Sequence, residues 1–102
     1  MSSAAVPPGI PRQAWERPTE FQRKVYGAVC RIPRVRTRSY QWVARRIGCP
    51  GASRAVGQAL TRNPFAPRVP CHRVVRADGT LGGFVWGPAN KRRLLLREGW
   101  RS

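Results

Sequence analysis

Residues 39–61, SYQWVARRIGCPGASRAVGQALT, decide the fold of this chain. Ser39 is a good N-cap for a first helix, whose apolar side chains share one face until a glycine ends it: Tyr40, Val43, Ala44, Ile47 and Gly48. After Cys49-Pro50-Gly51, a second helix directs its apolar side chains inward: Ala52, Ala55, Val56, Ala59 and Leu60. Two short helices joined by a tight Gly-containing turn are typical of a helix-turn-helix, with an ordinary helical hairpin as the alternative.

The opposite face of the second helix carries Arg54, Gly57, Gln58 and Thr61. A glycine in a helix interior costs about 1 kcal/mol relative to alanine. We therefore interpret Gly57 as a position where something outside the chain comes close. This face is the candidate binding surface.

The segments on either side complete a single small domain. Upstream, Thr19-Glu20-Phe21-Gln22 matches a capping box, and apolar residues at helical spacing predict a helix that Pro33 stops. Downstream, Val74-Val75, a turn at 77–79 and the stretch 81–85 predict a small β-hairpin, and a last helix begins at Pro88 and ends at Gly99. We expect a mostly α fold with a small β element, a winged helix-turn-helix-like single domain over residues 18–102.

Residues 1–17 contain several prolines and serines and no apolar run. They lack the features of a secretory signal peptide, so we expect a flexible leader. No later stretch is apolar for long enough to span a bilayer, which predicts an intracellular protein without a membrane partner.

The charge of the chain points to a polyanionic partner. Among its 102 residues are 20 Lys+Arg against 4 Asp+Glu, a formal net charge of +16. Such a charge repels itself unless an anion neutralises it, and arginine favours phosphate. DNA or RNA is the leading candidate, with an RNA binder of ribosomal type or an arginine-rich stabilised surface as alternatives.

The cysteines indicate neither a metal site nor a disulfide. Cys30, Cys49 and Cys71 are odd in number and widely spaced, and the chain has a single histidine. This is not a zinc-ligand pattern, and thiols stay reduced inside cells. We expect no metal and no cofactor.

Cys71 and His72 are the candidate reactive pair. A thiolate is the nucleophilic form of cysteine, and we expect Arg73 and the positive field to lower the pKa of Cys71. His72 would accept the proton, and Glu98 would orient the imidazole. Taken alone, this pair is equally compatible with a small core cysteine, and Glu98 with the wet end of an apolar stripe that includes Lys91, Leu94 and Leu95.

Several motifs in order resemble the O6-alkylguanine-DNA alkyltransferase family. They are Arg54-Ala55-Val56-Gly57-Gln58-Ala59, Asn63-Pro64, Pro70-Cys71-His72-Arg73-Val74, Gly79, Gly82-Gly83-Phe84, and Lys91 followed by Leu94-Leu95 and Glu98-Gly99. The resemblance runs from about Pro18 to Gly99. It implies single-use DNA repair by a monomer: the protein binds double-stranded DNA in the minor groove, flips out O6-alkylguanine, and transfers the alkyl group to cysteine.

The same resemblance implies a role for each matching residue. Cys71 is the alkyl acceptor, His72 and Glu98 deprotonate it through a water, and Tyr40 donates a proton toward N3 of guanine. Arg54 enters the duplex as an arginine finger, beside further DNA-binding residues: Ser39, Gly57, Gln58 and Thr61. The base pocket comprises Val74, Phe84, Val85 and Trp86, while Asn63 and Lys91 are structural at the site. A repair protein of this kind would be cytoplasmic and nucleoid-associated in a prokaryote, or nuclear in a eukaryote.

Departures from the family pattern leave rival interpretations open. Many members carry an additional N-terminal domain where this chain has its leader, which we expect to affect stability more than activity. Trp86 stands where small residues are common, so we expect poor acceptance of bulky O6 groups such as benzyl. The main rival is an alkyltransferase-like lesion sensor that flips the base without transfer and recruits excision-repair proteins. A transcriptional regulator that uses the helix-turn-helix alone is a further alternative.

Overall fold

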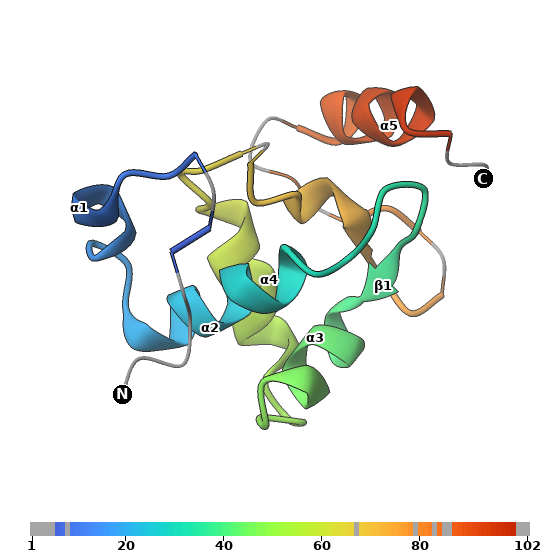
Figure 1. Cartoon of the computed structure of the whole chain (residues 1–102). Coiled ribbons are helices and arrows are strands. Elements are labelled where there is room, and N and C mark those ends of the chain that lie inside the picture. Colours follow the sequence, from blue (N-terminus) through green and yellow to red (C-terminus); the bar gives the residue numbers. More distant parts are fainter. Residues whose placement is uncertain are drawn as a thin grey trace.

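The computed structural model describes residues 6–7, 9–66, 68–78, 80–82, 84 and 87–99 (Figure 1). Its elements in chain order are α1 (Arg12–Trp15), α2 (Glu20–Val29), β1 (Arg38–Ser39), α3 (Tyr40–Arg46), α4 (Ser53–Thr61), the 3-10 turn η1 (Cys71–Arg73), β2 (Val74–Val75) and α5 (Pro88–Arg97). No helix within these ranges has the length and apolarity that crossing a membrane requires. The predicted class, mostly α with a small β element, is confirmed.

The helix-turn-helix segment forms as its local signals predict. The Ser39 side chain accepts the N–H of Trp42 at 3.0 Å and caps α3, and Gly48 follows the helix with a φ of +79°. On α4 the side chains of Val56, Ala59 and Leu60 are buried. Ala55 is exposed, contrary to our expectation, because it lies just beyond the edge of this apolar face.

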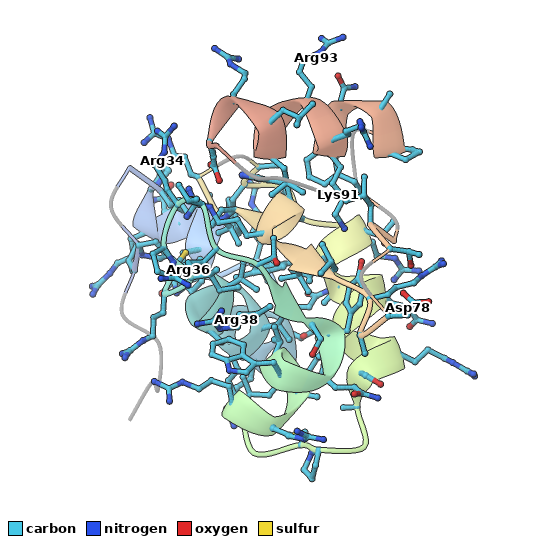
Figure 2. The ribbon with its side chains drawn as sticks, turned by 90° about the vertical axis from the view of Figure 1, so that its right-hand side faces the viewer. Arg34, Arg36, Arg38, Asp78, Lys91 and Arg93 are labelled. Atoms are coloured by element: carbon cyan, nitrogen blue, oxygen red, sulfur yellow. The ribbon has the colours of Figure 1, made fainter. Side chains whose placement is uncertain are left out.

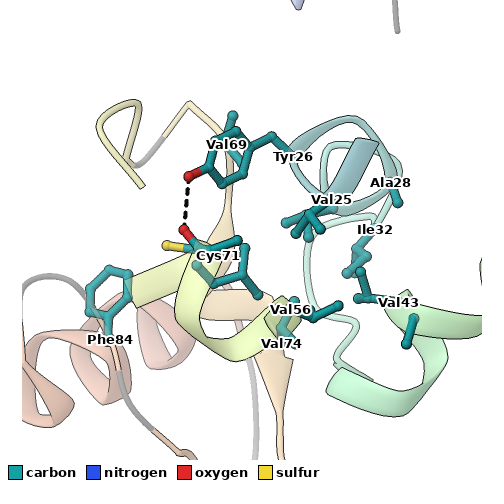
Figure 3. Packing of buried hydrophobic residues seen from close by; sticks show 14 of the residues in the cluster. Val25, Tyr26, Ala28, Ile32, Val43, Val56, Val69, Cys71, Val74 and Phe84 are labelled. Atoms are coloured by element: carbon teal, nitrogen blue, oxygen red, sulfur yellow. Dashed lines mark hydrogen bonds between the residues drawn. The ribbon is translucent and has the colours of Figure 1, made fainter. Parts of the chain in front are cut away.

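Helix α2 supplies the third wall of the core. Its predicted capping box is present: the Thr19 hydroxyl accepts the N–H of Gln22, and the Gln22 side chain accepts the N–H of Thr19. Buried side chains of α2, α3 and α4 pack against those of the segment that carries Cys71 (Figure 3). The buried Tyr26 hydroxyl donates to the Ala59 carbonyl at 2.8 Å and so ties α2 to α4.

The predicted β-hairpin is wrong in the described residues. β2 pairs in parallel with β1, with Arg38 opposite Val74 and Ser39 opposite Val75. Gly82 has a φ of +72°, so the chain bends there toward the Tyr40 ring instead of continuing as a returning strand. The sheet therefore fixes the start of α3 beside the end of η1.

The described part of the expected leader is packed. Residues 12–15 form α1, and Ile10 and Trp15 are buried in the core. The Trp15 ring lies 5.6 Å from the Phe65 ring and 6.4 Å from the Tyr26 ring, measured between centroids. A lone aromatic in a proline-containing stretch has no periodicity, so only the tertiary structure reveals this contact.

Helix α5 covers the end of the molecule opposite α3 (Figure 1). Pro88 occupies its first turn, as predicted, and Gly99 follows it with a φ of +95°. Figure 2 shows Lys91 directed from α5 into the molecule and Arg93 directed away from it. The inward stripe places Lys91, Leu95 and Glu98 over η1.

Candidate active site and DNA-binding face

Cys71 begins η1 and is buried. Its N–H donates to the Val69 carbonyl at 2.7 Å. The buried Asn63 holds this turn from both sides, since its Nδ2 donates to the same carbonyl at 3.0 Å and its Oδ1 accepts the N–H of Phe65 at 2.9 Å. A buried amide whose donor and acceptor are both used stabilises the turn that presents the thiol.

Burial raises the pKa of the Cys71 thiol, against our expectation of a lowered value. Desolvation disfavours the thiolate more than its polar neighbours favour it. The hydrogen bond from Asn63 and the charge of Lys91 oppose this effect. Arg73 does not lower the pKa of Cys71 as we expected, because its guanidinium is bound to the Glu98 carboxylate. Cys71 therefore needs a base to become a nucleophile at neutral pH.

The predicted contact between His72 and Glu98 is present. His72 Nε2 lies 2.9 Å from Glu98 Oε2, and the imidazole is buried. Arg73 clamps the same carboxylate: its Nε donates to Oε1 at 2.9 Å and its Nη2 to Oε2 at 2.8 Å. Its Nη1 donates to the Ile32 carbonyl at 2.7 Å, just beyond α2. The sequence motif contains Arg73, but nothing in it reveals these acceptors.

The electrostatics of this cluster assign the histidine tautomer. Burial works to raise the pKa of Glu98, but the hydrogen bonds from Arg73 and His72 overcome it, and the net pKa is lowered. The carboxylate is therefore ionised and accepts only, so Nε2 must carry hydrogen. Burial lowers the pKa of His72, which keeps the ring neutral at neutral pH. Nδ1 is then a buried lone pair without a hydrogen-bond partner in the described structure, as a base requires.

Tyr40 lies across from this cluster at the start of α3. Lys91 Nζ donates to its hydroxyl at 3.4 Å and sits 5.6 Å from its ring centroid. Burial lowers the pKa of the fully buried Lys91 to about 8, and burial also raises the pKa of Tyr40. Tyr40 thus stays a protonated phenol. A Cβ at Gly82 would lie 2.6 Å from its oxygen, so this approach requires glycine.

A cleft of about 370 Å³ opens beside Tyr40. It lies between α3, the start of α4 and the segment after β2, and is lined by Tyr40, Gln41, Ser53, Arg54, Gly57, Arg76 and Ala77. Arg54 is exposed at this cleft, as the helical periodicity predicts. A Cβ at Gly57 would meet the Tyr40 ring at 3.8 Å, an ordinary contact, so the fold itself does not demand this glycine.

The remaining candidates divide by position. Gln58 and Thr61 are exposed on α4. The Thr61 hydroxyl is already used within the helix, since it donates to the Gly57 carbonyl at 2.9 Å. The Ser39 hydroxyl is likewise used, as the N-cap of α3. Val74 is buried in β2, and the buried Phe84 ring meets His72 edge-on with centroids 6.3 Å apart. Val85 and Trp86 lie outside the described residues, as do Gly79 and Gly83. All three cysteines are free thiols.

Comparison with known proteins decides the family. The model of the 6-O-methylguanine DNA methyltransferase, DNA binding domain, matches residues 20–100. The chain belongs to this family. A methylated-DNA–protein-cysteine methyltransferase of Mycobacterium tuberculosis is 50% identical over 86 residues, which are 84% of this chain and 52% of that protein.

Solved structures of similar proteins share the fold. Mycobacterium tuberculosis OGT in complex with DNA matches with a TM-score of 0.79 and 51% identity, covering 81% of this chain and 51% of that one. An S. pombe protein in complex with damaged DNA containing O6-carboxymethylguanine matches with a TM-score of 0.73 and 38% identity. The match covers 81% of this chain and 79% of the S. pombe chain. The chain spans about half the length of the curated methyltransferases it matches, and less than a quarter of other relatives.

Proposed function

We propose that this protein repairs DNA by moving an alkyl group, methyl above all, from O6 of a flipped-out guanine to Cys71, once per molecule. The observation that carries the proposal is the His72 imidazole: Glu98 holds Nε2 at 2.9 Å and Nδ1 is a buried lone pair. Cys71, whose thiol has a raised pKa, directly precedes this neutral, oriented histidine in the chain, and nucleophilic catalysis by cysteine needs such a base.

The proposed step is a displacement at saturated carbon. The Cys71 sulfur forms a bond to the alkyl carbon while the bond from that carbon to O6 breaks, and the electron pair stays with guanine. The thiol proton passes through a water to His72, whose positive charge Glu98 stabilises. Tyr40 donates a proton toward N3 of the departing guanine, which balances the charge there. The thioether product cannot be displaced again, so each molecule acts once. The displacement changes no oxidation state and needs no cofactor.

The outer cleft would present the base. Arg54 enters the duplex from the minor groove and fills the space of the flipped nucleotide, while Ser39, Gly57, Gln58 and Thr61 contact the backbone. Val74, Phe84, Val85 and Trp86 would line the base pocket, within a repair domain that comprises residues 18–102 and the packed helix α1. The protein would act as a monomer in the nucleoid of a prokaryotic cytoplasm or in a eukaryotic nucleus.

A single-turnover assay tests this proposal. The protein is incubated with an equimolar duplex that carries O6-methylguanine, and its intact mass is measured together with the base composition of the duplex. We expect one added methylene per protein and an equal loss of the lesion, with neither change in Cys71→Ser. That variant should still bind the duplex, since phosphate contacts supply most of the affinity.

A lesion sensor is the second candidate. The S. pombe structure favours it, because that protein is 38% identical to this chain and is in complex with damaged DNA containing O6-carboxymethylguanine. The intact acceptor Cys71 favours transfer instead. Tight, lesion-specific binding without any gain of mass would support the sensor, which would then recruit excision-repair proteins.

A further inference from the structure

Arg76 follows β2 and lines the cleft that also contains Tyr40 and Arg54. It was not among the residues that the sequence motifs point to. The two arginines reach the cleft from different elements: Arg54 from the first turn of α4, and Arg76 from the other wall. The cleft residues include no acidic side chain.

The turn that carries Arg76 is built to hold its position. The Arg76 N–H donates to the Thr80 carbonyl at 2.9 Å. Asp78 Oδ1 accepts both the Thr80 N–H at 3.0 Å and the Thr80 hydroxyl at 2.7 Å. The hydrogen bonds from Thr80, and to a smaller extent the charge of Arg76, lower the pKa of Asp78. Asp78 therefore serves mainly the turn, and it forms no ion pair with Arg76 within the described residues.

The charge of Arg76 affects the pKa values of Tyr40 and Lys91 in the reactive site. It opposes the effect of burial on the pKa of Tyr40, and it adds to the effect of burial in lowering the pKa of Lys91. Arg76 is exposed, forms no ion pair in the described structure, and lines the same cleft as the proposed proton donor Tyr40. This environment suits a phosphate better than a structural ion pair.

We propose that Arg76 binds the backbone phosphate of the nucleotide that is rotated into the cleft. This inference rests on the proposed function for the identity of that nucleotide. Arg54 would fill the space that the flipped base leaves in the duplex, while Arg76 would bind the phosphate of the flipped nucleotide. The planar fork of arginine allows two donors to reach one phosphate. Arg76 is thus a positioning residue for the proposed reaction.

The salt dependence of binding tests this role. Affinity for a duplex carrying O6-methylguanine is measured over a range of salt concentrations for the parent, Arg76→Gln and Arg76→Lys. Arg92→Gln is the matched control, because Arg92 is also exposed but lies in the outer hollow of α5 with Arg93 and Leu96. Each glutamine variant removes a single positive charge.

We expect Arg76→Gln to bind about tenfold more weakly than the parent. Its slope of log affinity against log salt should fall by about 0.9, the value for a lost phosphate contact. Arg76→Lys should restore most of the slope. Arg92→Gln should match the parent. Equal slopes for Arg76→Gln and Arg92→Gln would overturn the proposal.

The same samples separate this inference from the proposed function. Intact mass after incubation reports transfer to the parent protein, whereas the slopes report binding alone. A parent that binds the lesion without gaining mass would contradict the transferase, and the slope comparison would still decide for or against Arg76. Thermal melting checks that both glutamine variants are folded.

Discussion

Arg73 and Arg76 stand three residues apart in the chain, on either side of β2, and their environments are opposite. Arg73 is largely buried, and donates to both carboxylate oxygens of Glu98 and to the Ile32 carbonyl. Arg76 is exposed at the cleft and has no ion pair in the described structure. The charged groups of the interior are thus paired with one another, whereas the arginine at the outer cleft is not paired with a carboxylate in the described structure.

This difference suits two separate roles: the interior around Cys71 for the proposed reaction, and the outer cleft for the binding of DNA. The interior around Cys71, His72 and Glu98 is held by short hydrogen bonds before any substrate arrives, which lowers the cost of organising the reaction. The outer cleft keeps its cations without acid partners, so their charge remains available for phosphate. The four acidic residues are engaged or lie elsewhere: Glu98 faces the interior, Glu20 pairs with Lys24, Asp78 holds its own turn, and Glu16 is exposed just after α1.

The largest effect should come from the interior arginine. Arg73→Gln leaves the mostly buried Glu98 carboxylate with His72 alone as its partner, so we expect the free energy of unfolding to fall by about 4 kcal/mol. Arg76→Gln should change it by less than about 0.5 kcal/mol, because the side chain is exposed. Denaturant titration of both variants measures the contrast. Equal losses would show that Arg76 is also structural.

The aromatic support at α1 should rank next. Trp15→Ala removes a buried ring from Tyr26 and Phe65, and we expect a loss of about 3 kcal/mol. Trp15→Phe is the control. It keeps an aromatic ring and removes an indole N–H that has no partner in the described structure, so its cost should be near 1 kcal/mol. A stable Trp15→Ala protein would mean that α1 is not part of the folded unit.

Acid should weaken the interior through His72. Burial lowers its folded pKa below the ordinary value of about 6.5, so below that pH the unfolded chain binds the proton first. We expect stability to fall as the pH drops below about 6.5, by up to about 1.4 kcal/mol per pH unit. Glu98, with its lowered pKa, adds a loss only at lower pH.

The variant His72→Asn separates the loss of stability caused by protonation of His72 from the loss caused by protonation of Glu98. Stability measured by denaturant at several pH values should become flat between pH 6.5 and 5 in this variant, while the parent retains its slope. A parent protein that is equally stable across this window would contradict the neutral, buried histidine on which the proposed proton transfer depends.

The smallest effect concerns backbone strain. Val35 has a φ of +73°, which is unfavourable for a β-branched residue, and its side chain is 56% exposed. Val35→Gly should therefore stabilise the protein by about 0.5 to 1 kcal/mol. Val35→Ala, which keeps a Cβ, should not. Thermal melting distinguishes them, and a destabilised glycine variant would show that the Val35 side chain is needed.

Local signals predicted the parts of the fold that depend on neighbours in sequence. Caps at Thr19 and Ser39 and terminators at Gly48 and Gly99 place α2, α3 and α5, because a helix begins and ends through contacts within a turn. The partner of β2 could not be predicted this way. Two-residue strands carry no periodicity, and β1 lies far away in the chain.

The candidate site shows the same division. The contact of His72 with Glu98 was predicted from the chemistry of the residues, and the structure places them together. The direction of the Cys71 pKa shift was wrong, because burial exceeds the effect of nearby charge and only the fold determines burial. The sequence motif includes Arg73 and not Arg76, but it does not show that one guanidinium binds Glu98 and the other is exposed; these environments appear only in three dimensions.

The most direct test of the account asks which thiol is alkylated. After incubation with a duplex carrying O6-methylguanine, the protein is digested and each of its three cysteine-containing peptides is measured by mass spectrometry. Cys30→Ser and Cys49→Ser serve as matched controls, since both residues are half-buried free thiols and neither directly precedes the histidine in the chain. We expect a single S-methyl group on Cys71 in the parent and in both controls. Methylation of Cys30 or Cys49, or an unmodified Cys71 in protein that has bound the lesion, would contradict the account.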